Sequence, residues 1–268
     1  DDEYESVLIR NELACVLNEA QRNTLSHKMG LTSALQLYEN NEPSLYEVEL
    51  TKMINRILVV GKKAPHVERL VKFFSLLLAK IHQHSHTNSK NSEDDLLSTQ
   101  VSRKSKKTFV TTNILEYLLE ASQVADKGIR WRSCQIIGTT LNHITGDIDD
   151  SIWEELKQCL LVRVQDKIPQ IRVAAIIALR RLHDPTDKKD RVVKEFVRVL
   201  TNDAQKEVRK AVIQSIGISK QTIPILIERT KDIAPEVRKE VYRALGTANQ
   251  SLFTTEQIVT IFDHGLTD

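Results

Sequence analysis

The sequence predicts an all-α fold, an α-solenoid built from roughly six stacked helical hairpins. Three observations support this prediction. A short phrase recurs at intervals of 29 to 40 residues, apolar residues follow each copy at helical spacing, and residues typical of sheets and tight turns are few. Only 8 of the 268 residues are glycine and 5% are aromatic, which disfavours a protein of strands and turns.

Each copy of the phrase begins with Asp and ends with Arg six residues later. The Asp can cap the turn after one helix, a Pro or Gly can fix that turn, and an aliphatic residue can begin the buried face of the next helix. An aliphatic residue precedes the Arg in the last three copies, and an apolar segment follows, such as residues 173–179. The four copies are Asp126–Arg132, Asp166–Arg172, Asp203–Arg209 and Asp232–Arg238.

Helical segments also precede the phrases. Apolar residues recur every three to four positions from Trp153 to Val164 and from Val192 to Leu200. Each hairpin therefore has an apolar face that only a neighbouring hairpin can bury, which is the arrangement of HEAT repeats. A looser copy of the pattern predicts earlier helices at 6–20, 25–38, 46–60 and 70–81.

We expect residues 1–268 to form one HEAT-repeat solenoid that is the N-terminal part of a longer one, because the chain ends where another phrase would begin. Residues 84–107 interrupt the pattern. They are rich in Ser, Asn, Lys and Asp, with an acidic cluster at 93–95 and a basic cluster at 103–107. Such a composition cannot offset the entropy lost on ordering. This segment is therefore predicted to be a flexible, disordered loop between two helices.

Charge is unevenly distributed along the chain, although the net charge is only +2. Residues 160–243 contain 19 Lys and Arg against 11 Asp and Glu, whereas residues 1–102 contain 11 against 14. A local excess of positive charge attracts polyanions. The three cysteines, Cys15, Cys134 and Cys159, are far apart in helical patterns, so we expect free thiols in a reducing intracellular compartment.

The charged residues of the phrase admit two interpretations. The Arg side chains could contact DNA, or the Asp and Arg of successive repeats could pair along a buried ladder that sets the register of the stack. We favour the ladder because the Arg occupies the position that defines the repeat in HEAT proteins that do not bind DNA. The predicted ladder residues are Asp126, Asp166, Arg172, Asp203, Arg209, Asp232 and Arg238.

Other cations near the phrases are better candidates for phosphate contacts. The second helices of a solenoid line its concave face, so Lys and Arg spaced along them can neutralise successive phosphates. A solvated surface is the alternative for each residue. No base-reading motif is present, so sequence-independent binding is expected. The candidates are Lys62, Lys63, Arg130, Arg132, Arg180, Arg181, Lys210 and Lys239.

The sequence contains none of the motifs that identify common enzymes. It has no Gly-Lys-Ser/Thr phosphate loop, no His-Glu-x-x-His, no Cys-x-x-Cys and no Gly-x-Ser-x-Gly. His82, His84 and His86 alternate, but no Cys or carboxylate lies at ligand spacing, so we expect a surface cluster and not a metal site. A non-enzymatic protein without cofactors or metals is predicted.

Several segments carry a resemblance to a known family, most strongly between Gly128 and Arg243. In chain order, these segments are 18–21, 27–28, 128–132, 163–172, 179–185, 207–211, 228–232 and 236–239. Together they resemble CAP-G, the HEAT-repeat subunit of condensin, over most of the chain outside the predicted loop.

The resemblance implies a non-SMC regulatory subunit of the condensin complex, acting in mitotic chromosome condensation. It implies binding to the kleisin subunit CAP-H, an indirect link through the kleisin to the SMC ATPase subunits, and binding of double-stranded DNA in a basic concave groove. It also implies a location in the nucleus and on chromosomes with a cytoplasmic pool, and no membrane association. The alternative is a HEAT-repeat adaptor that binds only proteins, as transport receptors and phosphatase scaffolds do. A hydrolase with a helical-repeat domain has no support in the sequence.

Overall fold

The computed structural model describes residues 2–90, 110–146, 148 and 150–267. Within these residues the chain forms thirteen α-helices, two short 3₁₀ helices and no strand. The predicted all-α class of helical repeats is therefore confirmed. The chain divides into two compact units, Asp1–Trp153 and Glu154–Asp268. A single continuous solenoid over residues 1–268 stays a prediction.

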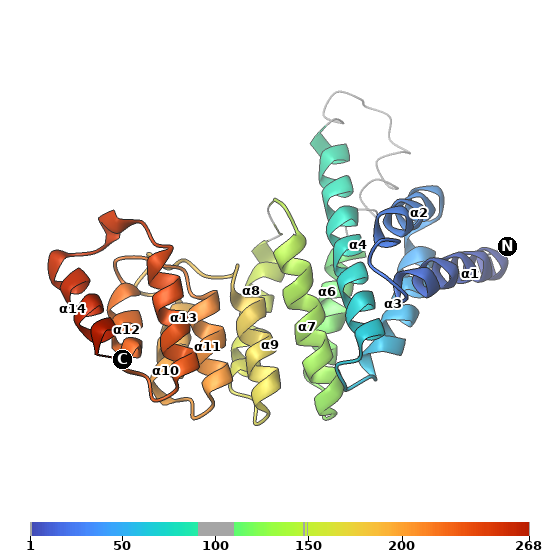
Figure 1. Ribbon diagram of the computed structural model, residues 1–268. Helices are drawn as coiled ribbons and strands as arrows, with labels where there is room; N and C mark the ends of the chain where they lie inside the picture. The colour runs from blue at the N-terminus through green and yellow to red at the C-terminus, as the bar shows by residue number, and fades with distance from the viewer. Residues whose placement is uncertain (1, 91–109, 147, 149, 268) are drawn as a thin grey trace. The chain divides into compact units, whose positions relative to one another are not determined.

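The first unit contains three consecutive helical hairpins (Figure 1). α1 packs against α2 and α3, α4 packs against α2 and α7, and α6 packs against α7. The second helix of one hairpin thus packs on the second helix of the next, as expected for stacked repeats. The helices are α1 (Asp2–Ala20), α2 (His27–Asn40), α3 (Pro43–Leu58), α4 (Pro65–Lys90), α6 (Val110–Ala121) and α7 (Lys127–His143).

Aromatic side chains fill the core where these helices cross. The rings of Tyr38 and Tyr46 meet edge to face with centroids 5.5 Å apart, and His27 meets Phe73 in the same way at 5.4 Å. Gly30 lies at this crossing, where an added Cβ would stand 3.2 Å from the Phe73 ring. A glycine therefore allows α2 to approach α4 closely.

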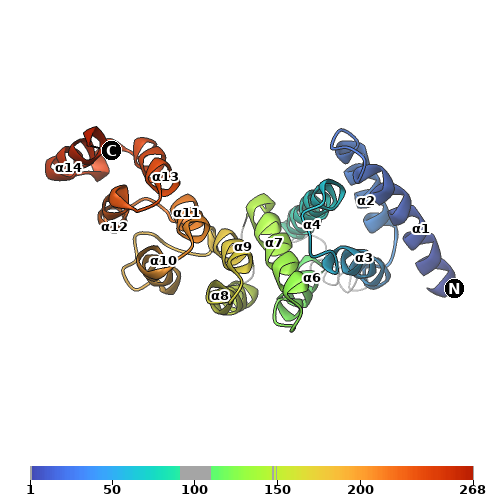
Figure 2. The ribbon, with the colours of Figure 1, turned by 60° about the horizontal axis from the view of Figure 1, so that its bottom comes forward.

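The second unit repeats the same arrangement. α9, α11 and α13 pack side by side in one row, and α10 and α12 pack on α11 and α13 from the other row (Figure 2). Two 3₁₀ helices, η1 (Arg229–Lys231) and η2 (Gln250–Leu252), lie in the connections. The α-helices are α8 (Asp150–Val164), α9 (Pro169–Leu179), α10 (Arg191–Asn202), α11 (Lys206–Ser215), α12 (Ile223–Glu228), α13 (Pro235–Gly246) and α14 (Thr255–Leu266).

The Asp of each phrase starts the turn before the second helix of a hairpin. In all four copies its Oδ1 accepts a hydrogen bond from the backbone N–H two residues later, at 2.7 to 3.0 Å. Pro169 and Pro235 then occupy the first positions of α9 and α13, where a missing N–H costs nothing. These local contacts explain why the phrase predicts helix starts accurately.

The predicted loop at 84–107 begins too early. α4 continues to Lys90, and Ser85 is buried with its Oγ 3.4 Å from Tyr38 Oη. His84 Nε2 lies 2.7 Å from Glu39 Oε1 on α2. Packing on α2 extends the helix past the point where its composition turns polar. Residues 91–107 lie outside the described part of the chain.

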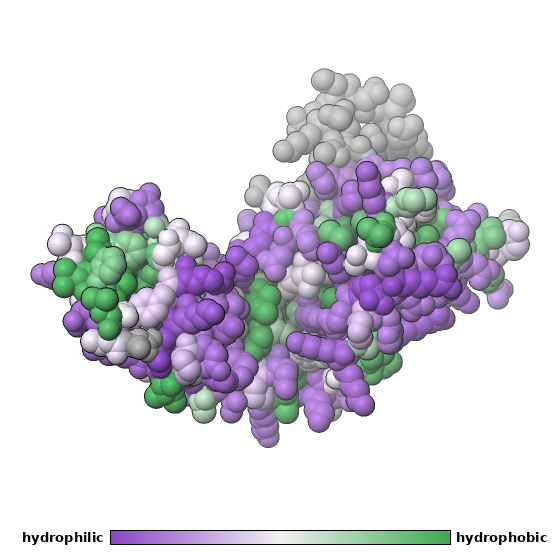
Figure 3. Space-filling model, in the orientation of Figure 1, coloured by the Kyte–Doolittle hydropathy of each residue, from purple (hydrophilic) through white to green (hydrophobic). Residues whose placement is uncertain are grey.

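α14 contributes no buried side chain to the second unit. Its apolar residues Ile258, Val259, Phe262 and Leu266 are exposed, and apolar atoms gather over this helix in Figure 3. The core of the unit therefore lies in the preceding helices. Among the described residues, no helix has the length and apolar character needed to span a membrane.

Candidate nucleic-acid interface

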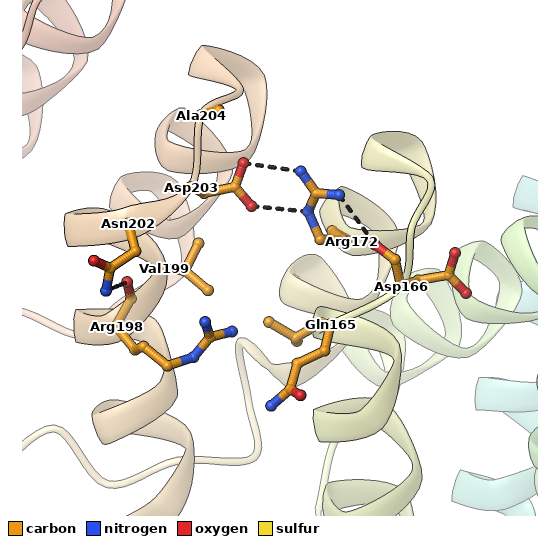
Figure 4. A pocket seen from close by; sticks show the side chains of 9 residues that line it. Gln165, Asp166, Arg172, Arg198, Val199, Asn202, Asp203 and Ala204 are labelled. Atoms are coloured by element: carbon orange, nitrogen blue, oxygen red, sulfur yellow. Dashed lines mark hydrogen bonds and ion pairs between the residues drawn. The ribbon is translucent and has the colours of Figure 1, made fainter.

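Two of the repeated arginines form bidentate ion pairs with the Asp of the following repeat. Arg172 donates from Nε and Nη2 to Asp203 at 2.8 and 2.9 Å (Figure 4). Arg209 donates from Nε and Nη2 to Asp232 at 2.8 and 2.6 Å. Paired, parallel hydrogen bonds between a guanidinium and a carboxylate are among the strongest side-chain interactions.

The same arginines also bind their own turns. Arg172 Nη1 donates to the carbonyl of Asp166 at 3.0 Å, and Arg209 Nη1 donates to the carbonyl of Asp203 at 2.8 Å. Each side chain thus joins two consecutive turns. We call these two sets of contacts the Arg–Asp ladder.

The second rung of the Arg–Asp ladder is buried. The side chains of Arg209 and Asp232 are 6% and 2% exposed. Burial alone would raise the pKa of Asp232, but hydrogen bonds from Arg209 and from the Ala234 N–H hold that pKa below its ordinary value. A phosphate could reach Arg209 only by replacing Asp232, so this arginine is engaged in packing.

The other predicted ladder residues make local contacts. Arg238 Nη1 donates to the carbonyl of Asp232 at 3.0 Å, which repeats the link within one turn. Asp166 Oδ2 lies 3.3 Å from Arg163 Nη1. Asp126 is exposed and caps α7 by accepting from the N–H groups of the second and third residues after it. Asp126 and Asp166 thus each stabilise the turn of their own repeat.

Arg132 requires a correction. It was a candidate for DNA contact, but its side chain is fully buried. Nη1 donates to Glu68 Oε1 at 2.7 Å, and Nη2 donates to the carbonyls of Val60 and Lys62 at 3.0 and 2.9 Å. Arg132 thus fastens α7 to the turn between α3 and α4, and it is excluded from the candidate surface.

The remaining candidate cations of the first unit lie at or next to the turns between paired helices. Lys62 and Lys63 are exposed in the turn before α4, which begins at Pro65. This turn packs tightly on the start of α7, because a Cβ added at Gly128 would stand 3.1 Å from Gly61 Cα. Lys62 and Lys63 therefore lie at the same end of the unit as the start of α7.

Arg130 and Lys127 add to this end of the first unit. Arg130 is half-buried, and its Nη1 donates to the carbonyls of Val124 and Ala125 at 3.1 and 2.6 Å. Lys127 is exposed. It was not among the predicted candidates, although a Lys directly after the phrase Asp recurs at Lys167 and could have indicated it.

In the second unit the candidates fall into two groups. Lys210 and Lys239 each follow a repeated Arg, on the packed helices α11 and α13, and are half-buried and exposed respectively. Arg180 is exposed at the end of α9, and Arg181 follows it half-buried. Because α9 begins at the ladder turn and ends at Leu179, the structure does not bring these arginines together with the two lysines.

A carboxylate lies within the lysine group of the second unit. Lys206 Nζ donates to Glu236 Oε1 at 2.6 Å, and this hydrogen bond lowers the pKa of Glu236. The charge of Lys210 contributes in the same direction. Glu236 therefore offsets part of the positive charge here, mostly that of Lys206.

A buried polar network in the first unit was missed from the sequence. Glu49 is fully buried, and it accepts hydrogen bonds from Ser6, Arg10 and Lys52 at 2.6 to 3.0 Å. The hydrogen bond from Arg10 is the main reason that the pKa of Glu49 falls to about 2. The available signal was a Glu in the apolar register of α3, between Tyr46 and Met53.

The three histidines at the end of α4 do not form the predicted surface cluster. His82 is buried, His84 contacts Glu39, and the side chain of His86 lies outside the described residues. Among the side chains that the structure describes, no group of three His, Cys, Asp or Glu could hold a metal ion.

Comparison with known proteins gives a consistent result. No family model matches the sequence. The chain is 28% identical to condensin complex subunit 3 of Homo sapiens over 231 residues, which are 80% of this chain and 22% of the human protein. Identity to the Xenopus laevis protein of the same name is 26%, covering 80% of this chain and 20% of that protein. For Schizosaccharomyces pombe it is 30%, covering 70% and 19%.

A solved structure is also similar. The crystal structure of the S. pombe condensin Cnd3–Cnd2 subcomplex matches with a TM-score of 0.74 and 26% identity, covering 96% of this chain and 30% of that chain. The chain spans about a fifth of the length of the curated relatives. The sequence and the fold together make this chain a homologue, over most of its length, of condensin complex subunit 3 (CAP-G).

Proposed function

We propose that the chain is the N-terminal part of a non-SMC regulatory subunit of condensin, a scaffold and not an enzyme, that acts in mitotic chromosome condensation. The observation that carries the proposal is the likeness to the Cnd3–Cnd2 subcomplex over 96% of the chain. Sequence likeness to proteins named condensin complex subunit 3 in two vertebrates and in fission yeast supports it. The expected location is the nucleus and chromosomes, with a cytoplasmic pool.

The proposed protein partner is the kleisin subunit CAP-H. The support is that the similar solved structure contains two subunits, Cnd3 and Cnd2. Through the kleisin, the chain would be linked indirectly to the SMC ATPase subunits.

The proposed nucleic-acid partner is double-stranded DNA, bound without sequence specificity. Its support is that some cations form ion pairs inside the protein and others lie at its surface. Arg132, Arg172 and Arg209 form internal ion pairs, whereas the candidates Lys62, Lys63, Arg180 and Lys239 are exposed. Lys and Arg side chains contact phosphates regardless of the base sequence. The proposed contacts are Lys62, Lys63 and Arg130 in the first unit and Arg180, Arg181, Lys210 and Lys239 in the second.

Duplex binding measured by fluorescence anisotropy tests the proposal. The experiment uses two duplexes of equal length and unrelated sequence, at several salt concentrations, with and without a CAP-H fragment. We expect equal affinity for both duplexes, a linear fall of log affinity with log salt, and tighter binding when the CAP-H fragment is present.

The alternative function is an adaptor that binds only proteins. An apolar peptide groove responds little to salt, whereas phosphate contacts respond strongly. A chain that binds the CAP-H fragment but neither duplex would contradict the DNA contact and retain the condensin assignment. Failure to bind either partner would favour the adaptor.

A further inference from the structure

A groove lies on the second unit between α10 and α12, outside the turns that form the Arg–Asp ladder. Its volume is about 750 Å³. Val193 and Val197 of α10 and Pro224 of α12 supply its apolar lining. The polar lining residues are Lys188, Lys194, Lys220 and Gln221. The groove thus combines an apolar surface with three positive charges from three separate segments.

Two connections at the edge of this groove are bound to each other. The Gly217 N–H donates to His183 Nε2 at 2.9 Å, and Ser219 Oγ donates to the carbonyl of Pro185 at 2.6 Å. Gln221 Nε2 also donates to the carbonyl of Thr186. These bonds join the segment that carries Lys188 to the segment that carries Lys220.

The two connections also pack closely. A Cβ added at Gly217 would stand 2.5 Å from Pro185 Cγ, so this contact requires a glycine. The two connections at this edge of the groove are therefore held together before any ligand binds. A preformed site loses less conformational entropy on binding.

The three lysines are available to a ligand. In the described residues none of them takes part in an ion pair or in a side-chain hydrogen bond. The nearby carboxylates of Asp184 and Asp187 accept hydrogen bonds from backbone N–H groups of their own connection, and Asp190 accepts from the first N–H groups of α10. These acids stabilise the turn, and none of them is among the residues that line the groove, so the lining itself is positive.

We propose that this groove binds an acidic peptide segment of a partner protein, in which Asp or Glu residues flank an aliphatic or aromatic residue. Carboxylates complement Lys188, Lys194 and Lys220, and the apolar side chain covers Val193, Val197 and Pro224. A DNA backbone offers phosphates but no side chain for the apolar surface, so the peptide is the better match. The inference stands on the groove alone and does not require the proposed function.

The test measures binding of a labelled twelve-residue peptide, with a central Leu-Phe pair between runs of Asp and Glu, to the full chain. The groove variant carries Lys188→Glu, Lys194→Glu and Lys220→Glu. The matched control carries Lys28→Glu, Lys80→Glu and Lys231→Glu, which are exposed lysines away from the groove with the same change in net charge. A second peptide replaces Leu-Phe with Ser-Ser.

We expect the groove variant to weaken binding by on the order of tenfold, because three partly exposed charge pairs are lost, and the control to change it by about twofold or less. The Ser-Ser peptide should bind several-fold more weakly. Equal losses in both variants would show attraction by net charge only and overturn the proposal. Equal binding of both peptides would show that the apolar surface is unused. If the parent chain does not bind the peptide and the groove variant loses duplex binding, the proposal is overturned and the groove is assigned to DNA.

Circular dichroism melting verifies that each variant folds. If the triple Glu variant is unfolded, the same three positions changed to Gln remove the charges without reversing them. The Gln variant is then compared with a control that carries Gln at the three control positions.

Discussion

A single side chain, Arg209, shows how the repeat uses one residue for two tasks. Its Nε and Nη2 bind the carboxylate of Asp232 in the next turn, and its Nη1 binds the carbonyl of Asp203 in its own turn. Lys210, the adjacent residue, makes no such contact in the described structure. Two neighbouring cations therefore differ in what they contribute to the fold.

We expect Arg209→Ala to reduce the free energy of unfolding by about 1–3 kcal/mol, because the buried carboxylate of Asp232 loses its charged partner. Lys210→Ala is the matched control and should leave stability nearly unchanged. Thermal and denaturant unfolding of both variants provide the measurement. A loss for Lys210→Ala as large as that for Arg209→Ala would remove the distinction between the two residues.

Glu49 predicts a dependence of stability on pH. Its pKa in the folded chain is about 2, below the ordinary value of 4.5, so its ionised form stabilises the fold above about pH 4.5. That contribution is lost as the pH falls through 4.5 toward 2. Glu49→Gln should lower stability at pH 7 by about 1–3 kcal/mol, and by less at pH 3.

The control for this prediction is Glu19→Gln, because Glu19 is exposed and forms an exposed ion pair with Arg22. It should have little effect at either pH. Urea unfolding of the three proteins at pH 7, 5, 4 and 3 gives the comparison. A constant difference between Glu49→Gln and the parent at every pH would contradict the assignment.

For individual residues, the sequence predicted some roles correctly and missed others. The constant spacing of Asp and Arg predicted a ladder, and two of its arginines, Arg172 and Arg209, bind the Asp of the following phrase. Arg132 was misassigned because its carboxylate partner, Glu68, lies in an earlier hairpin and not in the following phrase. The one available sign was Trp131, which replaces the aliphatic residue found before the Arg in the other copies.

The helix starts that lie within a repeated phrase could be predicted from the sequence, whereas the end of α4 could not. An Asp cap and a Pro act on the few residues that follow them, so the sequence alone identifies them. α4 continues to Lys90 because Ser85 and His84 meet Tyr38 and Glu39 on another helix. A contact between segments more than 40 residues apart leaves no pattern in the sequence near either segment.

Two deletions test this difference along α4. Removing residues 84–107 should lower the melting temperature, because it deletes the buried Ser85 and the contact between His84 and Glu39. Removing 91–107 alone should leave the melting temperature nearly unchanged, because that composition offers little to bury. Calorimetry of both deletions and the parent gives the result. Equal melting temperatures for the two deletions would show that the last turns of α4 add no stability.

For the whole molecule, the positions of the positive charges matter more for phosphate binding than the net charge does. The chain carries only +2 overall, and several of its arginines are used internally. The cations proposed to bind phosphate lie on both units, so each unit can be tested separately.

Charge reversal of Lys210 with Lys239, or of Lys62 with Lys63, should weaken duplex binding and leave folding intact. Each lost phosphate contact should reduce the slope of log affinity against log salt by about 0.9. Lys28→Glu with Lys80→Glu, at exposed positions on α2 and α4, is a control of equal charge change. Anisotropy titrations at two salt concentrations, with a melting curve for each variant, provide the data. Unchanged affinity and slope in both test variants would make these lysines a solvated surface.

The Arg–Asp ladder also has a mechanical consequence. Arg172 fastens the turn before α9 to the turn before α11, and Arg209 fastens that turn to the one before α13, so each rung spans one pair of neighbours. Tension applied along the chain would act on these ion pairs in series, so they would break one after another and not all together. In a single-molecule pulling experiment, the second unit should lengthen in discrete steps, each releasing about 30–40 residues, the length of one repeat. The stack would then lengthen by successive unfolding of repeats from its end, and the repeats would refold when the load is removed.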